Sequence, residues 1–205
     1  REHILYVGKP IRRLEDARLL TGRGRFVDDI GRPGELHAVF LRSPHPAARI
    51  RSIDKAPALG LPGVRLVLTG ADWRAAGLGD LPVVATVKSF DGTPMTQHAR
   101  PVFATARVRH VGDTVAMVVA DSLAPAMDGA EAIAIDYEPL PAIVDLAQSL
   151  APGAPKVHAG TSSNLACDWR VGDEVRVAMA MATAVHVIEI ELVNQRLTHL
   201  PIEPR

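Results

Sequence analysis

The sequence has 205 residues, enough for one domain or two small ones, with 47% hydrophobic and 22% charged residues, as in an ordinary globular protein. Its 23 Lys and Arg residues balance 23 Asp and Glu residues, so the net charge does not suggest a nucleic-acid-binding surface. Aromatic residues make up only 4%, too few for a base-stacking platform. The single cysteine, Cys167, excludes a disulfide framework, a cysteine-rich zinc site and an iron–sulfur cluster held by this chain, and no apolar run reaches the length of a membrane span.

The first half of the sequence predicts an irregular arm followed by short strands. Residues 1–20 read as extended chain with a turn of helix over 14–20, and a short strand is expected around Phe26. The pattern ELHAVFLRS predicts a strand over 35–43. Later expectations are a strand at 48–54, a short helix over 55–60 capped by Asp54, a strand at 64–69, a short helix over 71–77, and a loop over 78–100 that can hold a strand at 82–87.

The centre of the chain predicts a strand–helix–strand unit over 115–138. One strand precedes Gly112-Asp113 and another follows it, and the two are joined there by a hairpin or a kinked turn. The run TVAMVVA is apolar enough to be buried on both faces. Ser122 is expected to cap a helix of about a dozen residues. Its predicted packing stripe consists of Ala126, Ala130, Ala134, Met127 and Ile133. This order is typical of a crossover packed on a sheet.

The last part of the chain predicts two helices and a closing strand. A short helix is expected over 144–150, a Pro/Gly/Ser-rich linker over 151–165, and a helix over 174–184 with Asp173 as its N-cap. Residues 186–193 alternate apolar and polar, the pattern of a strand with one buried face. Because an exposed apolar edge promotes association, we expect this strand to be covered by a partner copy or to be disordered at its end.

The residues that could carry chemistry do not assemble a reaction centre. Gly22-x-Gly24 lacks the third glycine and the preceding strand of a dinucleotide site. Asp28 and Asp29 are adjacent, so they favour turn capping or a salt bridge over a shared proton. No two of the eight histidines have helical ligand spacing, and Cys167 has no activating partner nearby in sequence. The sequence therefore predicts no catalytic, cofactor-binding or metal-binding residue in this chain.

Several stretches, taken in order, nevertheless resemble one family. They are GKPIRRLEDARLLTGRGRFVDDI, ELHAVFLRSPHPAARIRSID, LPGVRLVLTGAD, VRHVGDTVAMVVADSLAPAMDGAEAIAIDYEPLPAIVD, and ELVNQRL followed by PIEPR. Together they resemble the large, molybdenum-binding subunit of the xanthine dehydrogenase and aldehyde oxidase family, which includes carbon monoxide dehydrogenase large chains. Pro46 and Ile202 depart from the residues that the family more often has there, Ala and Met.

The resemblance implies an α+β fold. Its parts are an N-terminal arm over 1–18, an α/β hammerhead domain (a mixed sheet with packed helices) over 19–141, a linker over 142–170, and the first elements of a molybdopterin-binding domain over 171–205. It also implies a cytoplasmic parent enzyme that hydroxylates an aldehyde or N-heterocycle, or oxidises CO, with water as the oxygen source. Molybdopterin, as the cytosine dinucleotide, would be held further along the parent chain, and electrons would pass to iron–sulfur and FAD subunits or domains.

On this resemblance, we expect the 205 residues to be a front piece that acts as a scaffold and docking region, inactive and without cofactor by itself. Two other hypotheses stay open. The chain can be a stand-alone assembly module or small subunit of a split molybdenum hydroxylase, or a free-standing small enzyme of unknown type.

Overall fold

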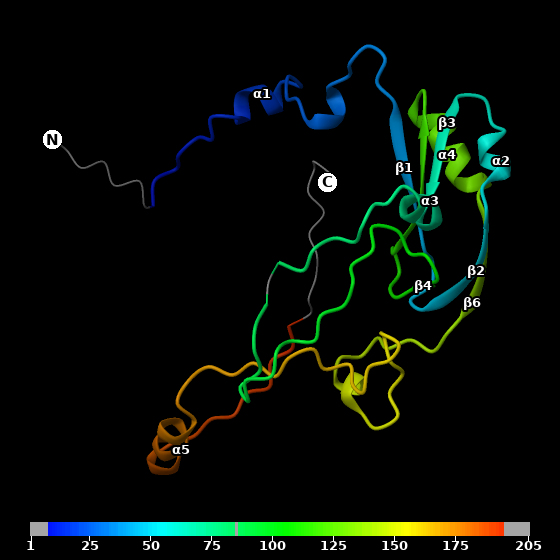
Figure 1. Cartoon of the computed structure of the whole chain (residues 1–205). Helices are drawn as coiled ribbons and strands as arrows, with labels where there is room; N and C mark the ends of the chain where they lie inside the picture. The colour runs from blue at the N-terminus through cyan, green and yellow to red at the C-terminus, as the bar shows by residue number, and fades with distance from the viewer. Residues whose placement is uncertain (1–7, 85, 195–205) are drawn as a thin grey trace. The chain divides into compact units, whose positions relative to one another are not determined.

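The computed structural model describes residues 8–84 and 86–194, which fall into two units (Figure 1). Residues 195–205, which carry the end of the family resemblance, lie outside the described residues, as do the first seven residues of the predicted arm. One unit is formed by residues up to Glu35 together with those from Ile188 onward. Its described part contains α1 (Asp16–Leu20) and the 3-10 turn η1 (Val27–Asp29).

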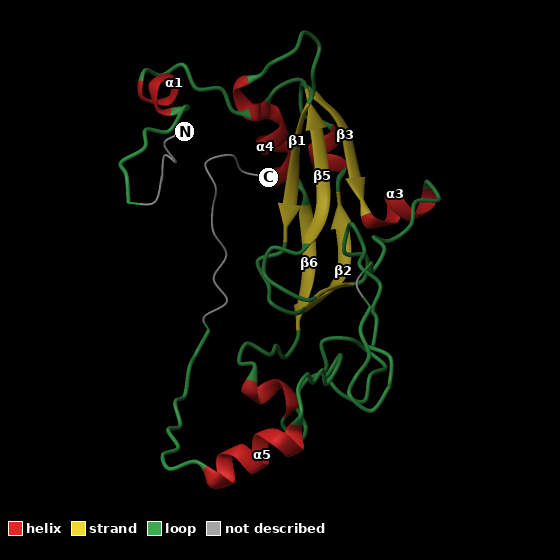
Figure 2. Cartoon of the chain, turned by 90° about the vertical axis from the view of Figure 1, so that its left-hand side faces the viewer, coloured by secondary structure: helices red, strands yellow, loops and turns green. Residues whose placement is uncertain are grey.

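The other unit, Leu36–Val187, contains the strands of the described chain. Its elements in chain order are β1 (His37–Arg42), β2 (Ala48–Asp54), α2 (Ala56–Leu59), β3 (Val64–Thr69), α3 (Gly70–Ala75), β4 (Arg107–Val108), β5 (Thr114–Ala120), α4 (Leu123–Ala132), β6 (Ala134–Pro139), the 3-10 turn η2 (Ala147–Leu150) and α5 (Glu174–Thr183). The strands form two three-stranded sheets, β1-β5-β3 and β4-β2-β6 (Figure 2). All pairs in both sheets are antiparallel. The α+β class is thus confirmed, but two antiparallel sheets stand in place of the expected mixed sheet.

The two sheets meet at a corner where the chain changes sheet twice. β1 leads into β2 through Ser43-Pro44-His45-Pro46, and β4 leads into β5 through the turn around Gly112. The backbone N–H of Ser43 donates to the carbonyl of Asp113, and the N–H of Gly112 donates to the carbonyl of Ser43, both at 2.8 Å. Gly112 has a φ of 88°, a conformation that other residues rarely adopt. Of the two predicted alternatives for the connection between β4 and β5, the structure has the kinked turn. A hairpin would keep both strands in one sheet.

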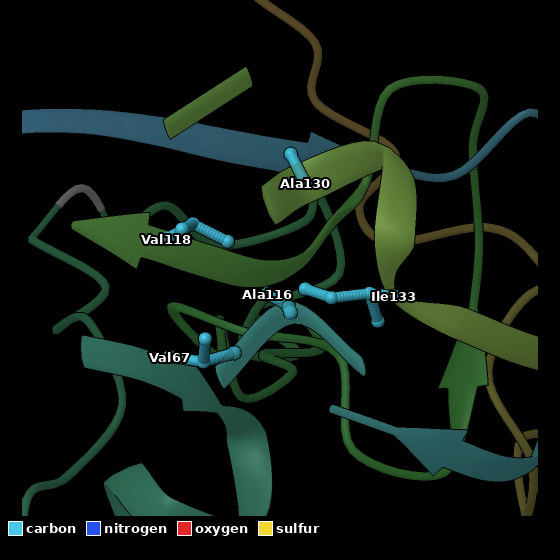
Figure 3. Close-up of a cluster of buried hydrophobic side chains, with 6 residues drawn as sticks. Val67, Ala116, Val118, Ala130 and Ile133 are labelled. Carbon is cyan, nitrogen blue, oxygen red and sulfur yellow. The ribbon is translucent and has the colours of Figure 1, made fainter. Parts of the chain in front are cut away.

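The core lies on both faces of β5. Adjacent residues of a strand face opposite sides, yet Val115 and Ala116 are both fully buried. Val115 packs with Ala48 and Val108 of the second sheet. The other face packs beneath α4 and α2, in a cluster of Ala58, Val67, Ala116, Val118, Ala130 and Ile133 (Figure 3). The prediction that TVAMVVA is buried on both faces is confirmed.

Most residues of the packing stripe predicted for α4 are buried, as expected. Ala126, Ala130 and Ile133 are buried, but Met127 remains 49% exposed, and Ala134 is an exposed residue of β6. Gly129, which the stripe omitted, is buried where the helix approaches β5 most closely. The predicted crossover was wrong in one respect: β5 and β6 belong to different sheets, so α4 connects the sheets rather than two neighbouring parallel strands.

Three predicted strands are absent from the described residues. The one near Phe26 is replaced by η1, in which the Asp29 carboxylate accepts a hydrogen bond from the Phe26 N–H at 2.9 Å, so the predicted capping role of Asp29 is confirmed. The described part of 82–87 forms only coil, next to the isolated bridge Leu81–Arg100. Residues 186–193 are extended coil and exposed. Apolar alternation creates a strand only where a neighbouring strand supplies the ladder.

The tight packing around Gly129 predicts that replacing it by Ala destabilises the protein, although Ala favours a helix more than Gly does. A Cβ at this position would lie 2.9 Å from Cγ1 of Val118 and 3.2 Å from Cγ2 of Val64. Overpacking of a filled core costs about 1–3 kcal/mol, against a gain of up to about 1 kcal/mol for replacing a helical Gly by Ala. We expect Gly129→Ala to lower the free energy of unfolding in urea, whereas Asp128→Ala, on the exposed face of α4, leaves it unchanged or raises it. Stabilisation by Gly129→Ala would contradict this packing.

The ion pair between Lys55 and Asp72 predicts a loss of stability in acid. The Lys55 Nζ lies 2.6 Å from Asp72 Oδ1, and Asp72 Oδ2 accepts hydrogen bonds from the N–H and hydroxyl of Thr69, the N-cap of α3. The bond from Lys55, followed by those from Thr69, lowers the pKa of Asp72 to about 2 against the opposing effect of burial. A carboxylate whose pKa is lowered by folding stabilises the native state above its unfolded pKa of about 4, and this contribution disappears as the pH falls through the folded value.

We therefore expect Asp72→Asn to reduce the free energy of unfolding at pH 7 by about 1 kcal/mol, a value discounted because both side chains are partly solvated. The difference from the wild type should shrink between pH 4 and pH 2, where wild-type Asp72 becomes protonated. Urea denaturation at a series of pH values measures this difference in the free energy of unfolding, with Asp128→Asn as the exposed control. A difference that stays constant down to pH 2 would show that the ion pair contributes nothing.

Candidate assembly surface

The helix α5 is apolar around most of its circumference but fully exposed. Its N-cap is Asp173, as predicted: the carboxylate accepts a hydrogen bond from the N–H of Arg176 at 2.9 Å. Apart from Glu174, Arg176 and Thr183, the residues of α5 are Val, Met and Ala. The exposed fractions of its large apolar residues are 69% for Val175, 59% for Val177, 66% for Met179 and 55% for Met181. We call these four residues the α5 surface.

An exposed helix of this composition indicates an interface. Helices that are hydrophobic all round are normally buried, and contiguous exposed apolar patches mark interaction sites. The chain that follows continues the pattern in both units. Val185 and Val187 are 89% and 59% exposed. In the other unit, Ile188, Ile190, Leu192 and Val193 are each more than 70% exposed. An isolated helix of ten residues is marginal in water, so α5 gains its stability only when another surface covers it.

The position of α5 depends on contacts between the long loop over 78–100 and the segment just before the helix. The N–H of Phe90 donates to the carbonyl of Asp168, and the N–H of Thr96 donates to the carbonyl of Ala166, both at 2.9 Å. The guanidinium of Arg170 lies 4.0 Å from the centroid of the Phe90 ring and forms an ion pair with Asp168 at 2.9 Å. These contacts fix the chain four residues before α5 begins.

A second contact joins the same loop to the linker. The imidazoles of His98 and His158 stack with their centroids 3.6 Å apart and their planes 4° from parallel. Further along, the Ser89 hydroxyl donates to the Cys167 sulfur at 3.6 Å and accepts from the N–H of Asp168 at 3.2 Å. The sequence predicts two separate irregular segments here, because no periodic pattern in the loop or the linker indicates that they pair. Proximity of two histidines 60 positions apart has no sequence signature.

The described residues gather few groups with catalytic potential. No three His, Cys, Asp or Glu side chains in the described part of the chain come together as a metal-ion site. Cys167 is partly buried and engaged with Ser89. Asp28 and Asp29 lie in the 3-10 turn, where Asp29 caps the backbone. No helix among the described residues is long and apolar enough to cross a membrane. The prediction that this chain contributes no catalytic, cofactor-binding or metal-binding residue stays a prediction.

Comparison with known proteins identifies one family. The family model described as "Aldehyde oxidase and xanthine dehydrogenase, a/b hammerhead domain" matches residues 21–141. The 6-hydroxypseudooxynicotine dehydrogenase complex subunit gamma of Paenarthrobacter nicotinovorans is 36% identical over 98% of this chain and 25% of its own length. The carbon monoxide dehydrogenase large chain of Afipia carboxidovorans is 33% identical over 98% of this chain and 25% of its own length. The chain thus spans about a quarter of the length of the curated relatives it matches.

Solved structures give the same result. Quinoline 2-oxidoreductase from Pseudomonas putida 86 superposes with a TM-score of 0.66 and 40% identity, over 78% of this chain and 19% of its own. The CO dehydrogenase from Oligotropha carboxidovorans superposes with a TM-score of 0.69 and 33% identity, over 87% of this chain and 22% of its own. Both identities are high enough to relate the proteins as well as the folds.

Proposed function

Because this chain belongs to the aldehyde oxidase and xanthine dehydrogenase family, whose a/b hammerhead domain it contains, we propose that it is the N-terminal part of the large subunit of a molybdenum hydroxylase. In this proposal residues 1–18 form an arm, 19–141 the hammerhead domain, 142–170 a linker, and 171–205 the beginning of the molybdopterin-binding domain. Relatives with molybdenum-binding subunits, such as a xanthine dehydrogenase and a nicotinate dehydrogenase, support the assignment.

The role proposed for these residues is scaffolding and docking. The observation that carries it is the α5 surface, which is apolar, preceded by a segment fixed by the loop over 78–100, and uncovered by any described part of the chain. In the whole protein, the three quarters of the large subunit that lie outside the 205 residues would cover it. Burial of four such side chains is worth about 1.5–3 kcal/mol each, which suffices to fold the helix and join the two parts.

A molybdopterin cofactor fits neither the cavity beside α5 nor the basic cavity at Arg107 and Arg109. The cavity beside α5 has a volume of about 580 Å³, but its lining includes the carboxylates of Asp173 and Glu174, which would repel the phosphates of the cofactor. Its cation, Arg170, is already paired with Asp168. A more basic cavity at Arg107 and Arg109 is only about 140 Å³, smaller than the sites that take a ligand of this size.

We therefore place the cofactor, as molybdopterin cytosine dinucleotide, in the remainder of the large subunit. The reaction we propose for the whole enzyme is hydroxylation of an aldehyde or an N-heterocycle, or oxidation of CO, with water as the oxygen source. Iron–sulfur and FAD subunits or domains in the cytoplasm would receive the electrons. The relatives include enzymes named for nicotine, quinoline, aldehydes and carbon monoxide, so the reaction class is better supported than any one substrate.

Purification of the protein from its own host tests this proposal. We expect a tag placed near residue 1 to recover a polypeptide about four times as long as 205 residues, because the chain spans 25% of its relatives, together with stoichiometric molybdenum by elemental mass spectrometry. Recovery of a 205-residue polypeptide with a separate molybdenum-containing chain would support the split-subunit alternative. A 205-residue polypeptide that turns over a substrate without molybdenum would contradict both.

A further inference from the structure

We propose that Arg107 and Arg109 bind one small oxyanion, either inorganic phosphate or a carboxylate, in a cavity that they line together with Arg74. The cavity has a volume of about 140 Å³ and lies within the unit that contains both sheets. The inference goes beyond the molybdenum hydroxylase proposal and does not depend on it. It rests on an excess of cationic side chains that the described residues leave without a counter-charge.

Arg107 of β4 and Arg109, which directly follows this strand, line the same cavity. Because side chains alternate along a strand, Arg107 faces away from Val108, which is fully buried in the core. Across the ladder, Arg107 lies opposite Arg49 of β2, an arrangement of like charges that destabilises a strand pair. The next residue in this row, Glu138 of β6, forms ion pairs with Arg49 at 3.3 Å and with Arg51 at 3.2 Å. Arg107 therefore lacks a carboxylate in its own sheet.

The guanidinium of Arg109 also lacks a hydrogen-bond acceptor for its Nε among the described residues, and this nitrogen is buried. The nearest acid in sequence, Asp113, accepts a hydrogen bond from the backbone N–H of Arg109 at 3.0 Å rather than from its side chain, and lies 3.8 Å from the imidazole of His110. A buried guanidinium nitrogen without an acceptor is unfavourable, and an anion in the cavity would remove that penalty.

The other charges around the two arginines do not compensate them. The carboxylate that lines the cavity, Asp80, is 2.6 Å from Arg74 and neutralises that residue. A small adjoining cavity is lined by Arg107 and Arg109 again, with Lys156 as a third cation and no acid. The pocket thus has the composition of an anion site: several guanidinium N–H donors and a net positive charge.

The neighbouring His158 responds to the same positive field. The pKa of His158 is lowered first by burial, and then by the charges of His98 and Arg109. The stack of His98 and His158 joins the loop to the linker beside the two arginines. An anion bound at Arg109 would thus lie near the histidine stack that joins the long loop to the linker.

Thermal unfolding of the full chain in phosphate tests the proposal. Ionic strength is held constant with sodium chloride, so that screening does not change. A ligand that binds only the native state raises the unfolding temperature with increasing concentration. We expect the rise to follow the logarithm of the phosphate concentration above the dissociation constant, as binding to a single site requires. Arg109→Gln should increase the phosphate concentration needed for the same shift by about tenfold, as loss of one charge-assisted donor implies. Sodium acetate in place of phosphate tells a carboxylate site from a phosphate site.

Two matched variants decide whether the effect is local. Arg107→Gln should weaken the shift like Arg109→Gln, while Arg176→Gln, an exposed arginine on α5, should leave it unchanged. Without phosphate, both cavity variants should unfold at the same or a higher temperature than the wild type, since they relieve repulsion. If neither phosphate nor acetate raises the unfolding temperature at constant ionic strength, or if all three variants reduce the shift equally, the proposal is wrong.

Discussion

The corner at which Ser43 exchanges backbone hydrogen bonds with Gly112 and Asp113 determines most of this fold. Both chain segments that pass through it leave one sheet and enter the other, so the two 2.8 Å bonds hold the sheets at a common edge. With the corner fixed, β5 becomes the central strand of the first sheet, and its residue Val115 packs against the second. The helix α4 then follows as the connection that covers β5 and returns to the second sheet.

The part of this unit that bears on function is the segment leading into α5. The long loop over 78–100 and the segment 166–170 are joined by backbone hydrogen bonds and by the contact of Arg170 with Phe90. These contacts fix the chain that leads into α5, whose apolar residues are exposed. The described chain thus combines a core that is complete around β5 with a helix whose composition requires a further surface. That combination is expected of a scaffold within a larger family member and is unusual for a small independent enzyme.

The sequence predicted the elements that local pattern determines. β2 and β3 were predicted at their observed bounds, and the Asp173 cap and the buried run of β5 were also correct, because alternation, capping and continuous apolarity each have a direct local cause. The strand expected near Phe26 failed for a local reason, the turn capped by Asp29. The other errors in strand and sheet assignment come from dependence on partners distant in sequence. The segment 186–193 has the alternation of a strand but no neighbouring strand in the described chain, and the division into two sheets follows from the pairing at the corner. The contact of His98 with His158 and the arginines around the small cavity could be found only in three dimensions.

Hydrogen exchange of the α5 amides tests most directly the claim that this helix is an interface for the rest of a large subunit. The measurement compares the 205-residue chain with the longer protein from its own host, with the amides of β5 as an internal reference. We predict fast exchange over 174–183 in the shorter chain and protection close to that of β5 in the longer protein, because a short helix is protected only when it is covered. Equal and fast exchange of α5 in both proteins, with β5 protected in both, would contradict the account.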